Sequence, residues 1–236
     1  MTDAPTPESP SIWDDFIDIW TSPTALFARR ADGKWGHAMI FFVVLGAILF
    51  FGTRGATAPI FEAEMARGMA ASSQQLTPEQ LEAGRSVARV MTPIMVVIGG
   101  PILLLLLALG VWLATKLMGG AISFAQGLTI ACFAEFPRLV EAVSTAVQAM
   151  LMEESALTGR YSVSLGVGRF FDPDTAHAAL LALVGRIDIF TLWITVLVTI
   201  GIKVVGKRST DQAVMAGAIV WLLGALPTVV PALFQG

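Results

Sequence analysis

The sequence predicts an all-α protein of the membrane: a polytopic bundle of five transmembrane helices, with short amphipathic helices at its N-terminus and in its loops. Of its 236 residues, 55% are hydrophobic and only 14% are charged, and the mean hydropathy of +0.73 is well above what a soluble domain needs to fill one core. Roughly 20 helical residues cross the hydrocarbon layer of a bilayer, and five apolar stretches approach or exceed that length.

The first ten residues are predicted to be a flexible tail, because they carry three prolines and almost no apolar side chains. Residues 11–34 are predicted to form cytoplasmic interfacial helices. Ser11 and Asp14 have the spacing of a capping box that opens a short helix. A second short helix is expected from Pro23, whose fixed φ suits a first helical turn, to Ala31.

The first of these short helices is amphipathic, and we expect its aromatic face to lie at the membrane surface. Asp14, Asp15 and Asp18 are expected on the opposite face. Aromatic rings are typical anchors at the level of the lipid headgroups. The predicted interfacial anchors are Trp13, Phe16, Trp20 and Trp35.

Residues 35–236 are predicted to form the transmembrane domain. The spans are placed at about residues 35–53, 90–115, 124–152, 187–205 and 212–234. The polar loop after the first span is expected to contain two helices, the second of which begins at a capping box at Thr77 and runs directly into the second span. Pro93 is expected to bend that span.

The positions of the basic residues predict the orientation. Arginines are about equally frequent on the two sides, but all lysines fall on one side, where the basic residues lie in short loops close to the ends of the spans. Because such residues favour the cytoplasm, we expect a cytoplasmic N-terminus and an outside C-terminus. The basic residues on this side are Arg29, Arg30, Lys34, Lys116, Lys203, Lys207 and Arg208.

The third span is the most informative stretch, because it carries Glu135, Pro137, Arg138 and Glu141 where hydrocarbon is expected. Ionisable groups inside a membrane are costly unless they find partners. The three charged residues are spaced three apart, so each can reach the next on a helix. Pro137 has no backbone N–H and should kink the helix, leaving a carbonyl near residue 133 free.

Three readings of this intramembrane polar cluster are open. Arg138 and a glutamate can form a structural pair, closed by Arg186 or Asp188 at the head of the fourth span. Alternatively, the cluster binds an ion, a proton or a lipid headgroup. In the third reading the segment is an interfacial turn between two short helices, where charge costs little.

Several classes of function are disfavoured by composition. One cysteine, Cys132, and two histidines cannot assemble a disulfide or a His/Cys metal cluster within one chain, and no cofactor is expected. No cleavable signal peptide is recognised in the acidic N-terminus. The net charge of −3 predicts no nucleic-acid binding. The glycines of residues 162–168 lack the preceding strand and third glycine of a phosphate loop, and no catalytic triad or metalloprotease motif is present.

The second half of the chain resembles the Yip1-domain family of five-span membrane proteins. The resemblance rests on the segment from Gln126 to Pro137, on an Asp-x-Phe-x-x-Trp pattern that begins at Asp188, and on Gly201 near the end of the fourth span. It implies a five-helix bundle with a cytoplasmic N-terminus. Eukaryotic members are associated with Rab GTPases, vesicle traffic and membrane shaping. This chain has a short head without the Asp-Leu-Tyr-Gly-Pro-like motif of those members, so it resembles a bacterial member.

The sequence as a whole predicts a non-enzymatic protein of the bacterial inner membrane that organises or shapes membrane, or binds a partner. The expected partners are membrane lipid and another membrane or peripheral protein, and a homo-oligomer is left open. The alternative is a small transporter or channel for an ion or a lipid that uses the polar cluster of the third span. A cavity at that cluster, reaching one surface, favours the alternative over a closed structural pair.

Overall fold

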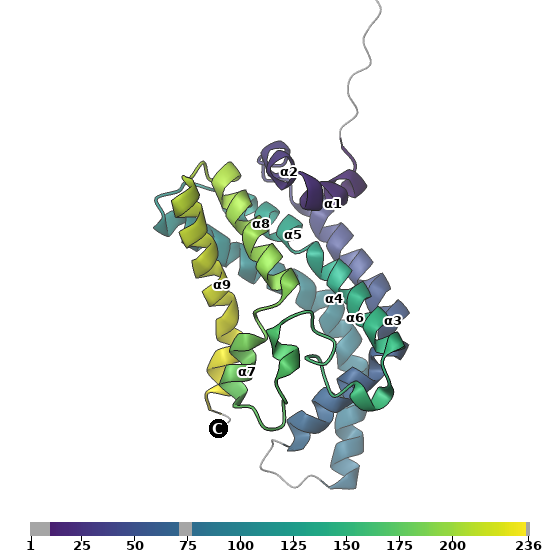
Figure 1. Cartoon of the computed structure of the whole chain (residues 1–236). Coiled ribbons are helices and arrows are strands. Elements are labelled where there is room, and N and C mark those ends of the chain that lie inside the picture. The colour runs from purple at the N-terminus through teal and green to yellow at the C-terminus, as the bar shows by residue number, and fades with distance from the viewer. Residues whose placement is uncertain (1–9, 71–76, 235–236) are drawn as a thin grey trace, which may run out of the picture.

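The structure is a computed structural model, and it describes residues 10–70 and 77–234. The predicted flexible tail lies outside the described residues except for Pro10. Within these ranges the regular structure is helical (Figure 1). The α-helices are α1 (Ile12–Thr21), α2 (Pro23–Arg29), α3 (Gly36–Ala70), α4 (Pro78–Leu117), α5 (Phe124–Ala134), α6 (Pro137–Leu151), α7 (Ala178–Val184), α8 (Ile189–Val205) and α9 (Thr210–Ala232), and the short 3₁₀ helices are η1 (Glu154–Ala156) and η2 (Val167–Phe170).

Three of these helices, α3, α4 and α9, are long and apolar enough to cross a membrane. α8 is apolar but has 17 residues, and the predicted third span is divided between α5 and α6. Large apolar side chains along the long helices face outward, with Ile40 65% exposed and Leu103 67% exposed. Such surfaces are rare in water and are expected where lipid is the solvent.

α3 and α4 extend beyond the predicted first and second spans. At 1.5 Å per residue, their 35 and 40 residues are about 52 and 60 Å long, compared with a hydrocarbon layer of about 30 Å. The helix expected after the first span is therefore not separate, because α3 continues without a break to Ala70. α4 begins at the predicted capping box of Thr77 and, as expected, runs directly into the second span.

The predicted third span breaks at Glu135 and Phe136, where α5 ends and α6 begins at Pro137. This matches the reading with two short helices. The expectation of a free carbonyl at residue 133 was wrong, because the Phe136 N–H donates to the Phe133 carbonyl at 3.2 Å. The backbone hydrogen bonds here join residues three positions apart, as in a 3₁₀ turn. They satisfy the Phe133 carbonyl, to which Pro137 cannot donate because it has no N–H.

α5 is the centre of the core, since every residue from Gly127 to Ala134 is buried. α4, α8 and α3 pack around it. α8 approaches α5 closely at Gly201, where an added Cβ would lie 2.6 Å from Cγ2 of the fully buried Ile130. The absence of a side chain at Gly201 sets the spacing of these two helices.

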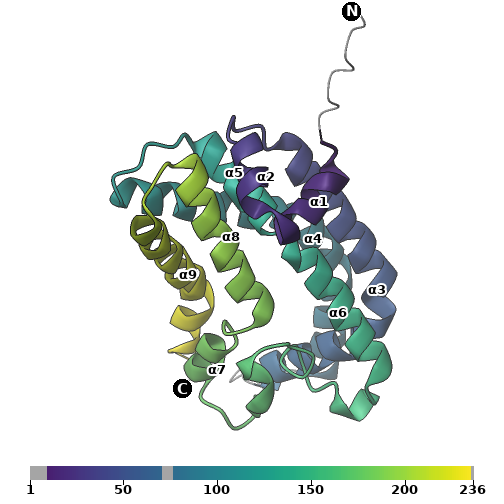
Figure 2. The same ribbon diagram turned by 45° about the horizontal axis from the view of Figure 1, so that its top comes forward.

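The bundle has two distinct ends (Figures 1 and 2). α1 and α2 lie across the end where α3 begins, and the α4–α5 and α8–α9 turns lie at the same end. Hydrogen bonds from Gln126 to the Ala31 carbonyl, at 2.9 Å, and from Arg208 to the Gly119 carbonyl, at 3.0 Å, join these segments. We call this the N-terminal end. The loop from residue 152 to 177, α7 and the end of α9 lie at the opposite end.

Candidate functional site: a polar pocket between α6 and α8

Arg138, in the first turn of α6, has three side-chain partners. Its Nη1 donates to Oε2 of Glu141 at 2.5 Å, and its Nη2 donates to Oγ1 of Thr191 at 2.9 Å. Its Nε lies 3.6 Å from Oε2 of Glu135. The guanidinium is therefore held between two carboxylates of its own segment and a hydroxyl of α8, so it ties α6 to α8.

Thr191 is positioned by the cap of α8. The carboxylate of Asp188 accepts hydrogen bonds from the backbone N–H groups of Phe190 and Thr191, both at 2.9 Å. Such a cap satisfies backbone donors at a helix N-terminus and favours the negative charge there. Asp188 and Thr191 are both buried, at 7% and 4% exposure. The link between α6 and α8 thus runs through Thr191.

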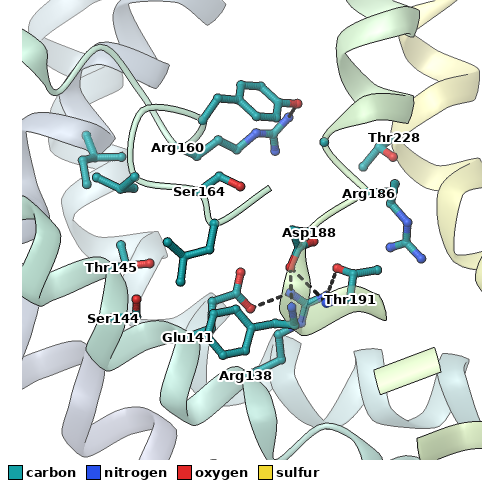
Figure 3. A pocket seen from close by; sticks show the side chains of 16 residues that line it. Arg138, Glu141, Ser144, Thr145, Arg160, Ser164, Arg186, Asp188, Thr191 and Thr228 are labelled. Carbon is teal, nitrogen blue, oxygen red and sulfur yellow. Dashed lines mark hydrogen bonds and ion pairs between the residues drawn. The ribbon is translucent and has the colours of Figure 1, made fainter. Parts of the chain in front are cut away.

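Beside this link lies an open pocket of about 260 Å³ (Figure 3). Its walls come from α3, α6, the loop after α6, the segment before α8, the first turn of α8, and α9. Arg138, Glu141 and Asp188 line it together with two further arginines and several hydroxyl groups. The polar lining residues are Arg138, Glu141, Ser144, Thr145, Arg160, Tyr161, Ser164, Arg186, Asp188, Thr191 and Thr228.

Arg186 lines the pocket next to α9. Its Nη2 donates to the Trp221 carbonyl at 3.2 Å, and its guanidinium carbon lies 5.8 Å from the centre of the Trp221 ring. A Cβ at Gly224 would come within 2.8 Å of Nη2, so this glycine makes room for the guanidinium. The Nε of Arg186 is buried without a hydrogen-bond partner among the described residues.

Arg160 lines the pocket from the loop after α6. Its Nη2 donates to the hydroxyl of Tyr161 at 2.9 Å, and its guanidinium lies over the ring of that tyrosine at 4.8 Å. Within the described part of the chain, neither Arg160 nor Arg186 has a carboxylate within ion-pair distance. The pocket therefore contains two positive charges that the protein does not neutralise by direct contact.

The extension of α3 holds the loop that carries Arg160. Arg67 donates to Oδ1 of Asp174 at 2.8 Å and to the Thr158 carbonyl at 2.7 Å. Glu64 accepts from the backbone N–H of Arg160 at 2.9 Å. This explains why α3 continues past the length of a membrane span: its last turns fix one wall of the pocket.

Towards the N-terminal end, the space beyond the pocket is filled with apolar side chains. Ile130, Phe133 and Leu197 are each 0% exposed and belong to the continuous core between α5 and α8. The loops that form the opposite wall lie at the other end of the bundle (Figure 1). Packed apolar side chains therefore separate the pocket from the N-terminal end of the bundle.

Comparison with known proteins decides the family. The family model of the Yip1 domain matches residues 17–230 of this chain, nearly its whole length. The chain belongs to the Yip1 family. It is 26% identical over 234 residues to the membrane protein YknW of Bacillus subtilis, and the match covers 97% of this chain and 91% of that protein. No solved structure matches the chain significantly.

The residues that carry the Yip1 resemblance lie beside the pocket or in the helix contacts between it and the N-terminal end. Pro137 begins α6 and presents Arg138 one residue later. Asp188 caps α8, and Trp193, which completes its motif, stacks on Trp20 of α1 with ring centres 6.3 Å apart. Gly201 lets α8 approach α5. In this Yip1 member the short motifs therefore fix the packing of the helices around the site.

The N-terminal helices are fastened by a buried aspartate. Asp15 was expected on the polar face of α1 but is fully buried, because its carboxylate accepts from Nη2 of Arg29 at 2.7 Å and of Arg30 at 2.6 Å. Arg29 also contacts Asp18 at 2.6 Å. Although burial by itself lowers the pKa of Arg29, hydrogen bonds to the two aspartates raise it above its ordinary value. These charges join α1 to α2.

The four aromatic residues expected as membrane anchors have different surroundings. Trp13 is 58% exposed and Trp20 is 37% exposed, so both present area to the outside. Phe16 instead packs inward, with its ring 5.8 Å from that of Phe41 on α3. Trp35 is half-buried and lies against the core. Phe16 and Trp35 thus contribute to docking the N-terminal helices onto the bundle.

The sequence located the cluster but not the whole pocket. Glu135, Arg138 and Glu141 do come together, and the two residues named as further partners, Arg186 and Asp188, line the same pocket without hydrogen-bonding Arg138. Sequence reasoning missed Thr191, although an aspartate directly before an apolar run is a signal for a helix N-cap, and Thr191 lies three residues after it.

The loop wall of the pocket had no readable signal in the sequence. The segment rejected as a phosphate loop supplies Ser164, and its Gly166 lies so close to the chain before α8 that a Cβ would meet the Ile187 carbonyl at 2.5 Å. Arg160 and Thr228 reach the pocket from distant parts of the chain. Only the folded structure brings these residues together.

Proposed function

We propose that this Yip1 protein is a non-enzymatic protein of the bacterial inner membrane, with its N-terminus in the cytoplasm and its C-terminus outside. Five membrane passages follow if α8 and the joined pair α5 and α6 each cross the bilayer alongside α3, α4 and α9. The orientation is supported by Lys116, Lys203 and Lys207, which lie at the N-terminal end of the bundle.

Its proposed role is to bind a ligand, either a membrane lipid or part of a partner protein, and through it to organise the membrane. The observation that carries this proposal is the polar pocket beside Arg138, which packed apolar side chains separate from the N-terminal end. In the proposed orientation the pocket opens towards the outer side of the membrane. A pocket that is closed on its inner side by buried apolar side chains suits retention of a ligand rather than passage through the bundle.

A small transporter or channel is the second candidate, and one observation favours it. The pocket lies between α6 and α8 and is lined by Arg138 and Glu141, as expected for an intramembrane site that an ion or a lipid visits. Transport requires that the core at Phe133 and Leu197 open towards the N-terminal end.

The absence of enzymatic activity is also part of the proposal. Among the described residues, no group of three His, Cys, Asp or Glu side chains is placed to hold a metal ion. Cys132 is buried in α5, and His177 accepts a hydrogen bond from the backbone N–H of Ala179 as the cap of α7. These environments suit structural roles for the cysteine and for this histidine.

The proposal is tested by purifying the protein in native lipid nanodiscs and identifying what is retained, together with ion-flux measurements on proteoliposomes. We expect a lipid or a protein to co-purify at a fixed ratio and ion flux to equal that of empty liposomes. Ion flux that is lost in Glu141→Gln would instead establish the second candidate and contradict the first.

A further inference from the structure

The charges that line the pocket are not balanced by direct contacts. Arg138 is matched by Glu135 and Glu141, and Asp188 accepts from the backbone at the start of α8. This leaves Arg160 and Arg186 facing the pocket without a carboxylate partner among the described residues. Arginines and carboxylates are equal in number at this site, three of each, but two guanidinium groups without a carboxylate in contact leave donors for an oxyanion between the walls that carry them.

The hydrogen-bond donors of these arginines are also largely unused. A guanidinium has five N–H donors, and one hydrogen bond from the side chain is present for each: to the Trp221 carbonyl from Arg186 and to the Tyr161 hydroxyl from Arg160. The Nε of Arg186 is buried and has no partner in the described part of the chain. Since buried donors are nearly always paired, this atom points to a missing acceptor.

The shape and setting of the pocket narrow the class of anion. A planar guanidinium matches the oxygens of a phosphate group in a bidentate fork, and the hydroxyl of Ser164 offers a neutral donor on the loop wall. The volume of about 260 Å³ is below the roughly 300–1,000 Å³ of sites for drug-sized ligands, so it suits a headgroup rather than a whole lipid.

We propose that the pocket binds a phosphate group through Arg160 and Arg186, either the phosphate of a phospholipid headgroup or a free phosphate. The inference rests on the proposed ligand-binding function and adds the class of ligand. In the proposed orientation the phosphate comes from the outer leaflet or from the outer aqueous phase.

The test uses the whole protein, stripped of phospholipid in a maltoside detergent, and measures binding by calorimetry and by the shift in melting temperature. The probes are dihexanoyl phosphatidylglycerol, inorganic phosphate and a phosphate-free monoacylglycerol. We expect phosphatidylglycerol to bind and to raise the melting temperature, and monoacylglycerol to do neither. If inorganic phosphate displaces phosphatidylglycerol, free phosphate is also a ligand of the site. If it does not displace the lipid, the site is specific for the lipid headgroup.

Three variants separate the site from general charge effects. Arg160→Gln and Arg186→Gln should each weaken phosphatidylglycerol binding by about tenfold or more, because each removes charge-assisted hydrogen bonds. Arg169→Gln is the matched control, since Arg169 is exposed on η2 and does not line the pocket. Arg160 is itself exposed, so its variant keeps the test valid if Arg186→Gln does not fold.

Equal binding by wild type and Arg160→Gln, or equal binding of monoacylglycerol and phosphatidylglycerol, overturns the inference. The proposed function survives that result if native nanodiscs still retain a ligand. A different result contradicts the proposed function: nothing is retained in native nanodiscs and the proteoliposomes conduct ions.

Discussion

At the scale of single residues, Arg138 is where the charges of the polar cluster find their partners. A lone charge among apolar helices is costly, and here the guanidinium has two carboxylates and the Thr191 hydroxyl as partners. The side chains of Arg138 and Glu141 are each about one-third exposed, on the wall of the pocket. The pair therefore fixes α6 against α8 and also shapes one side of the ligand site.

We predict that Glu141→Gln lowers the free energy of unfolding by about 1 kcal/mol, since a neutral amide replaces the charge in a hydrogen bond of 2.5 Å. The measurement is reversible unfolding in mixed micelles. Glu154→Gln, at an exposed position in η1, is the control and should leave stability unchanged. Unchanged stability in Glu141→Gln would show that the pair does not hold the helices together.

Gly159 is a second residue whose role can be tested. Its φ of +141° suits glycine, and an added Cβ would lie 2.5 Å from Oε1 of Glu64. We predict that Gly159→Ala destabilises the protein by roughly 1–3 kcal/mol and weakens ligand binding, because it displaces the loop that carries Arg160. Gly68→Ala, on α3 with open space around it, should do neither. Equal melting temperatures for the two variants would contradict this role.

At the scale of elements, the break between α5 and α6 and the cap of α8 create the site. Pro137 ends one helix and begins the next, which turns Arg138 towards α8, and Asp188 starts α8 at the level where Thr191 meets it. Both are local effects of one residue on the backbone. This is why the sequence could locate the cluster and its proline.

The close approach of α5 and α8 gives the prediction at this scale. Gly201→Ala should lower stability by roughly 1–3 kcal/mol, since its Cβ would overlap Ile130, which has no room to move. Gly110→Ala, where the nearest atom is 3.9 Å away, is the matched control. The double variant Gly201→Ala with Ile130→Ala should lose less stability than the sum of the two single variants, because Ile130→Ala removes the Cγ2 atom that the added methyl group would meet. If Gly201→Ala has the same melting temperature as the wild type, α5 and α8 do not pack as closely at this glycine as the structure shows.

At the scale of the whole molecule, composition predicted the class of protein but not the walls of the pocket. Mean hydropathy depends on composition alone, and the capping boxes at Ser11 and Thr77 depend on residues close together in the chain. Both could therefore be predicted from the sequence. The bonds from Arg67 to Asp174 and from Glu64 to the Arg160 backbone join residues about 100 positions apart. Contacts of that kind arise from tertiary packing, so no local sequence pattern predicts them.

The burial of Asp15 and the unbroken length of α3 escaped prediction for the same reason. An aspartate on an amphipathic helix is ordinarily solvated, and only the packing of α2 supplies the two arginines that neutralise it. The polar residues after the first span suggested a separate loop helix, but α3 remains continuous and its last turns bind the loop after α6.

The central claim is that the polar pocket is reached only from the side of the membrane opposite the N-terminus. Labelling of introduced cysteines with a membrane-impermeant maleimide tests this most directly, and Cys132 is buried and should not react. We predict that Ser164→Cys is labelled in intact spheroplasts but not in inverted vesicles, and that Ser11→Cys gives the reverse pattern. Labelling of Ser164→Cys from both sides, or of Ser11→Cys in intact spheroplasts, would contradict the account.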